Sequence, residues 1–164
     1  MPFIVEPLSR DHLRAAYPLV RATMPGLGLD AWLRFARGAT GVRREGRSGI
    51  IVARRAGHDF PIGLFCYRVD RDPVLERVLV AEHFAAMDLL HPGEVIAVLV
   101  RELDRLGERL GCRAVRSVVH RPDVMGGLAQ AGHASAGSLL GKVFVAEETD
   151  QPPGQEAAGP ETSA

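Results

Sequence analysis

The feature that most constrains the fold is one amphipathic segment, residues 91–111, with an apolar β-rich run on either side. Its apolar residues recur at spacings of four, four, three and four, as on one face of an α-helix (Val95, Leu99, Leu103, Leu106 and Leu110). Pro92 fits the first helical position, and Gly111 fits the C-terminal end. Together with the apolar runs at 85–90 and 114–119, this helical segment predicts a strand–helix–strand unit. Its two strands are parallel and joined by a right-handed crossover.

Before this unit, the sequence predicts a strand over residues 3–5 and two helices over 10–23 and 31–38. A hairpin follows, with strands at 50–53 and 62–69. Pro18 should kink or split the first helix, because proline removes a helical hydrogen bond. Asp30 is the expected N-cap of the second helix, and Gly38 is its expected stop.

The run 74–90 is too long for one regular strand, so we expect a β-bulge or break near Glu82, His83 and Phe84. After the unit, the sequence predicts a short helix over residues 122–131 and a last strand over 139–145. The element order is β-α-α-β-β-β-α-β-α-β. It indicates an α+β fold with a mixed α/β sheet around the parallel strand–helix–strand unit.

The chain divides by charge into two parts. Its 20 acidic residues balance 20 Lys and Arg, but residues 146–164 carry five acids, no base and no aliphatic residue larger than alanine. Such a segment cannot bury enough apolar surface to offset its ordering entropy, so we expect a disordered acidic tail. Residues 1–145 then form one basic domain, and an anionic ligand remains electrostatically compatible with it.

The order of elements resembles that of the GNAT superfamily of acyl-CoA-dependent N-acyltransferases, over residues 3–145. The matching pieces are FIVEPLSRDHLRAA, GIIVARRAGHDFPIGLFCYRV, LLHPGEVIAVLVRELDRLGERLGCRAVRSVV and GLAQAGHASAG. The resemblance implies transfer of an acyl group, such as acetyl from acetyl-CoA, to an amine of a small molecule or a protein. It also implies that the pantetheine lies between two splayed parallel strands, here residues 85–90 and 114–119, with the pyrophosphate at the N-terminus of the helix between them.

That position supplies the cofactor-binding prediction. Unpaired N–H groups and the positive dipole end of a helix attract a diphosphate. The resemblance therefore places acyl-CoA contacts at the end of the first parallel strand and in the first helical turn (Leu89, Leu90, His91, Gly93, Glu94 and Val95). His120 and Arg121 follow the second parallel strand, at the end where open α/β sheets bind ligands. The loop is short, Pro92 lacks a donor and Glu94 adds a carboxylate, so an ordinary capped helix start is the alternative.

For catalysis, the resemblance implies either a tyrosine in the penultimate helix or a carboxylate on the strand before the pyrophosphate loop. Residues 124–133 contain no tyrosine, so Glu82 is the candidate base, with His83 beside it. On a regularly alternating strand these two side chains point to opposite faces, and at most one lines a cleft. The alternative function is a non-catalytic GNAT-like domain that acts by protein interaction or ligand sensing.

Other partners and locations follow from composition. The first dozen residues include acids, and the longest uncharged stretch, residues 124–141, holds five glycines, so we expect a cytoplasmic protein with no membrane partner. Five arginines in residues 43–55 lack interleaved aromatic residues, which argues against a nucleic-acid partner. Cys66 and Cys112 are expected as reduced thiols, and no metal site is predicted. A single last strand leaves an exposed edge that a second subunit in a homodimer would complete.

Overall fold

Five strands form one mixed sheet in the order β1-β2-β3-β4-β5, so each strand pairs with its neighbour along the chain. The computed structural model describes residues 2–41, 46–88 and 91–137. The strands are β1 (Phe3–Pro7), β2 (Ser48–Arg55), β3 (Gly63–Asp72), β4 (Glu76–Ala86) and β5 (Ala114–Ser117). The helices are the 3₁₀ helix η1 (Arg10–His12), α1 (Tyr17–Thr23), α2 (Leu29–Ala39), α3 (Pro92–Arg109) and α4 (Pro122–Gln130). All of these elements lie in one compact unit, Met1–Ala134.

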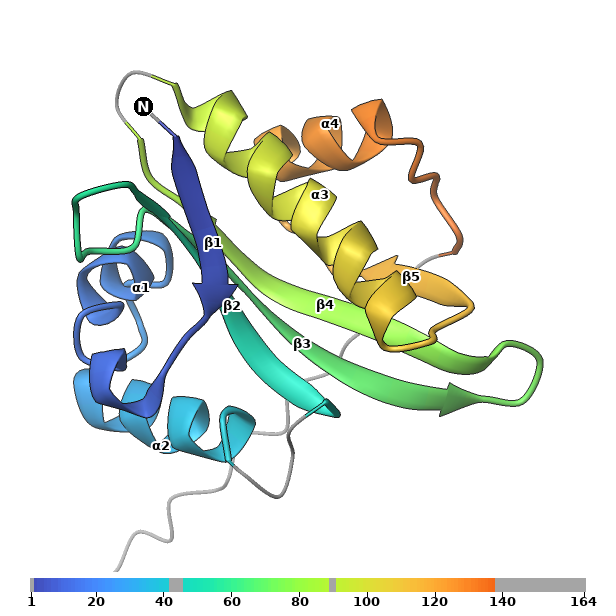
Figure 1. Cartoon of the computed structure of the whole chain (residues 1–164), viewed down its shortest axis with the longest axis horizontal. Helices are drawn as coiled ribbons and strands as arrows, with labels where there is room; N and C mark the ends of the chain where they lie inside the picture. The colour runs from blue at the N-terminus through green and yellow to red at the C-terminus, as the bar shows by residue number, and fades with distance from the viewer. Residues whose placement is uncertain (1, 42–45, 89–90, 138–164) are drawn as a thin grey trace, which may run out of the picture. The chain divides into compact units, whose positions relative to one another are not determined.

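Helices cover both faces of the sheet (Figure 1). Helices α3 and α4 pack on one face, in a core that includes Phe65, Leu79 and Leu103. Helices α1 and α2 pack on the other face around Trp32, whose indole Nε1–H donates to the carbonyl oxygen of Leu13 at 2.8 Å. The sheet is therefore the middle of three layers. Three of its pairings are antiparallel and one is parallel, which confirms the predicted α+β fold with a mixed sheet.

The helices confirm most of the sequence predictions. Helix α3 buries the apolar face read from its periodicity, and Gly111 follows it with a φ of +64°. Pro18 divides the first predicted helix into η1 and α1, and it lies in the first turn of α1, where a missing N–H costs little.

The bounds of α2 correct two predictions. Its N-cap is Gly28, and Asp30 lies inside the first turn, where its negative charge faces the positive end of the helix dipole. The helix continues through Gly38 to Ala39, because one glycine costs only about 1 kcal/mol relative to alanine. The burial of Trp32 and Ala36 holds these turns in place.

The parallel unit is present, but its first strand lies earlier than predicted. β4 and β5 are parallel, and residues 78–81 pair with residues 114–117. The expected first strand, residues 85–90, overlaps only the last two residues of β4, and Leu89 and Leu90 lie outside the described residues. The error has a physical cause: the apolar run extends beyond the part of β4 that has a parallel partner.

Two further predictions concern residues that the structure does not describe. The expected last strand, residues 139–145, and the acidic tail, residues 146–164, both lie there. Within the described ranges, no helix combines the length and apolar character needed to cross a membrane.

Candidate active site

Strand β4 changes phase at His83. Leu79 and Ala81 belong to the core under α3, and so do Phe84 and Ala86, although side chains alternate along a regular strand. The pairing with β3 shifts at the same place, and His83 has a φ of +56°. One extra residue therefore stands in β4 as a β-bulge, which confirms the irregularity predicted from the length of the run.

The bulge brings Glu82 and His83 to the same side of the strand. Glu82 Oε2 lies 3.7 Å from His83 Nε2, so the expectation that the two side chains point to opposite faces is wrong. The Glu82 carboxylate also forms an ion pair with Arg68 of β3. The His83 ring meets the ring of Phe35 of α2 edge to face, with 5.6 Å between centroids.

The two parallel strands separate directly beside this bulge. The backbone N–H of Val118 donates to the carbonyl oxygen of Ala81 at 2.9 Å. Beyond this bond, β4 runs on to Ala86 while the other chain turns towards α4. Among the described residues, no backbone hydrogen bond joins residues 82–86 to the chain after Val118. On this side of β4, residues 82–86 therefore have no strand partner among the described residues, although the carbonyl oxygen of Ala86 accepts from Arg121.

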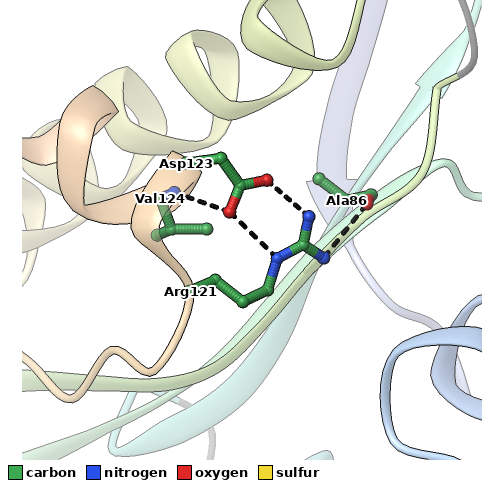
Figure 2. Close-up of polar contacts among 4 residues, drawn as sticks. All are labelled: Ala86, Arg121, Asp123 and Val124. Atoms are coloured by element: carbon green, nitrogen blue, oxygen red, sulfur yellow. Dashed lines mark hydrogen bonds and ion pairs between the residues drawn. The ribbon is translucent and has the colours of Figure 1, made fainter.

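Arg121 bridges the separated strands, as Figure 2 shows. Its Nη1 donates to the carbonyl oxygen of Ala86 at 3.2 Å, and its Nε donates to Asp123 Oδ1 at 3.1 Å. A second bond, from Nη2 to Asp123 Oδ2, makes the pair bidentate, and hydrogen bonding from Arg121 lowers the pKa of Asp123. The arginine predicted to contact the cofactor therefore already holds the end of β4 to the start of α4.

The segment that leads into α3 is held by a residue that the sequence analysis missed, although the N-cap itself, His91, makes no side-chain capping bond. Asp88 accepts a hydrogen bond from the backbone N–H of His91 at 3.0 Å, and its side chain is 7% exposed and ion-paired with Arg55. The N–H of Glu94 donates to the carbonyl oxygen of His91 at 3.1 Å. Two of the expected phosphate donors are thus bonded within the protein. The signal in the sequence is an acidic residue three positions before His91.

The rest of the first turn of α3 stays open. His91, Pro92, Gly93 and Glu94 are exposed, whereas the predicted contact Val95 is buried in the core. No heavy atom beyond its chain neighbours and the backbone of its own helix lies within 4 Å of a Cβ built on Gly93. An anion can therefore approach this turn from solvent, towards the positive end of the helix dipole.

Neither Cys66 nor Tyr17 supplies a reactive group here. Burial raises the pKa of the Cys66 thiol to about 12, so it stays protonated at neutral pH. Tyr17 donates its hydroxyl to the carbonyl oxygen of Leu27 at 3.1 Å, on α1. Glu82, His83 and His120 are the other titratable side chains that we consider for proton transfer.

The electrostatics of the site keep His83 neutral. Burial lowers the pKa of His83 below its ordinary value of 6.5, and the positive charges of His120 and Arg68 lower it further. The Glu82 carboxylate favours the protonated ring, and it is also ion-paired with Arg68. His83 therefore carries a free lone pair at neutral pH and can accept a proton.

Removing the charge of His120 should raise the pKa of His83. In the His120→Gln protein, the midpoint in an NMR titration of the His83 ring protons should move up towards 6.5. Replacing His58, which is exposed in the β2–β3 turn, should leave that midpoint in place. An unchanged midpoint in the His120→Gln protein would contradict the proximity of the two rings.

Comparisons with known proteins find similarity in structure but not in sequence. No family model matches the chain, and no curated protein matches it. The aminoglycoside N-acetyltransferase AAC(6')-Iy, in complex with a CoA bisubstrate analogue, superposes with a TM-score of 0.72 at 16% identity, over 89% of this chain and 100% of that one. Glucosamine-6-phosphate N-acetyltransferase from Arabidopsis thaliana gives 0.71 at 11% identity, over 88% and 99%. A transcriptional regulator from Bacillus halodurans gives 0.73 at 12% identity, over 87% and 100%.

Proposed function

We propose that this chain, which has the GNAT fold, transfers an acyl group from acyl-CoA to an amine where β4 and β5 separate. The observation that carries the proposal is the bulge at His83, which places Glu82 and His83 together beside the point of separation. A proton acceptor, His83, thus lies where the edges of β4 and β5 are no longer paired with each other.

The residues present there fit a CoA thioester as substrate. Its pantetheine would lie along residues 82–86 of β4 on the side away from β3, where β5 no longer pairs with the strand. Its pyrophosphate would lie near the exposed turn at Gly93, with His120 and Arg121 on the opposite side. Asp88 and Glu94 oppose an anion at this turn, but Arg55 already neutralises Asp88.

In the proposed reaction, the amine nitrogen attacks the thioester carbon; a C–N bond forms and the C–S bond breaks. His83, neutral at pH 7, takes the proton that the amine loses. Glu82, 3.7 Å away, stabilises the imidazolium that results. The CoA thiolate leaves and takes a proton from water or from His120.

A second candidate function is ligand sensing without catalysis. It is favoured by the Asp88–Arg55 pair, whose carboxylate binds the N–H of His91 just before α3, and by the absence of a tyrosine from α4. The fold alone does not decide between the two functions, because one fold hosts many activities.

A turnover screen separates them. The protein is incubated with acetyl-CoA and a panel of primary amines that includes aminoglycosides, amino sugars and N-terminal peptides, and the release of free thiol is followed. Amine-dependent release supports acyl transfer. Acetyl-CoA binding without release for any amine would favour the sensing function.

A further inference from the structure

A second surface lies at the opposite edge of the sheet from β5. There, a hollow of about 390 Å³ opens between β1 and α3. Phe3 and Val5 of β1 line it, together with one face of α3 (Val98, Arg101, Glu102 and Arg105). Apolar side chains from β1 and α3 thus lie beside charged side chains of α3, and the proposed transferase site does not use this hollow.

The backbone of β1 offers free hydrogen-bonding groups beside the hollow. Leu8 N–H donates to Ile50, and the carbonyl oxygen of Pro2 accepts from Ala56, so the even-numbered residues of β1 bond to β2. The peptide groups of Phe3 and Val5 therefore point away from β2. Among the described residues, no other strand pairs with β1. The edge is thus a template for an added strand.

The charges on the rim define what such a strand should carry. Arg101 and Arg105 are exposed and form no ion pair within the described part of the chain, whereas Glu102 pairs with Arg109 at 2.6 Å. Four residues of helix place the two arginines about 6 Å apart along α3. Alternate residues of a strand lie about 6.7 Å apart. Two acids at positions i and i+2 of an extended peptide match that spacing.

We propose that an extended acidic peptide of another protein adds to the free edge of β1. Its backbone bonds to Phe3 and Val5, and its alternate side chains enter the hollow, two of them acids that meet Arg101 and Arg105. Charge argues against a second copy as the occupant. An antiparallel β1–β1 pair would bring the arginines of both copies to the same face of the joined sheet, where they would repel.

A labelled peptide tests this inference. Fluorescence anisotropy with the heptapeptide TETETVT should show saturable binding to the full chain, and TKTKTVT should not bind. Arg101→Ala with Arg105→Ala should weaken binding about fivefold. The matched control removes two exposed arginines from α2, Arg34→Ala with Arg37→Ala, and should leave the affinity unchanged.

Val5→Pro tests strand addition separately from charge. It removes an N–H that β2 does not use, so the sheet can retain its pairing, which a thermal melt would verify. It should weaken TETETVT binding about tenfold. The N–H of residue 5 is lost as a donor, and the peptide carbonyl that would accept from it is left without a hydrogen bond. Full affinity for TETETVT in a folded Val5→Pro protein would overturn the inference. The arginines would then bind the acids of the peptide without any added strand. Concentration-dependent dimerisation abolished by Val5→Pro would overturn it in favour of a second copy.

Discussion

Replacing His83 by asparagine should lower kcat/KM for acyl transfer by about 100-fold, the lower end of the usual contribution of a general base. Asparagine removes the proton acceptor but tolerates the left-handed backbone of this position, where φ is +56°. The bulge and its neighbours should therefore survive the change. The measurement is the initial rate of thiol release from acetyl-CoA, with an amine identified by the turnover screen.

Two variants control this result. His58→Asn removes an exposed histidine from the β2–β3 turn and should leave kcat/KM unchanged. Glu82→Gln should cause a smaller loss than His83→Asn, since the carboxylate stabilises the imidazolium without taking the proton. A severe loss in Glu82→Gln with full activity in His83→Asn would assign the base to Glu82. Full activity in both would remove catalysis from the bulge.

Gly127→Ala should make the protein about 2 kcal/mol less stable than Gly126→Ala, although both changes lie in α4. A Cβ at Gly127 would lie 2.5 Å from Ile96 Cγ2 of α3, a contact that the packed helices cannot hold without shifting. Overpacking of this kind costs about 1–3 kcal/mol. At Gly126 the Cβ position is open to 4 Å, so alanine should gain up to about 1 kcal/mol of helix propensity.

Urea unfolding of the two variants and the unchanged protein measures this difference directly. The two variants have the same composition, and each replaces one glycine of α4 with alanine. The contact with Ile96 is what distinguishes them. Equal stability of the two variants would contradict the close approach of α3 and α4. The contact also bears on the candidate site, because the first turn of α4 carries Asp123, the partner of Arg121.

The predictable parts of the fold are those that local patterns dictate. The four-and-three spacing of Val95, Leu99 and Leu103 predicts α3, because only one helical face can bury all three. Pro18 marks the division between η1 and α1, since proline has no N–H to donate. The length of the run before α3 predicts an irregular strand, but the phase change at His83 depends on how β3 pairs with β4.

The contacts that shape the candidate site are less predictable. Arg55 and Asp88 lie 33 positions apart, and Arg121 and Ala86 lie 35 apart, so no local pattern connects them. Ala86 contributes its carbonyl oxygen, which every residue possesses, and sequence cannot mark it. The resemblance makes Glu82 the candidate base, with His83 beside it, but only the backbone conformation at the bulge brings their side chains together.

Calorimetric titration of the full chain with acetyl-CoA tests the central claim, that the separated strands bind a CoA thioester. We expect heat that saturates at one equivalent with a dissociation constant below millimolar. No heat of binding with acetyl-CoA at millimolar concentration would contradict it.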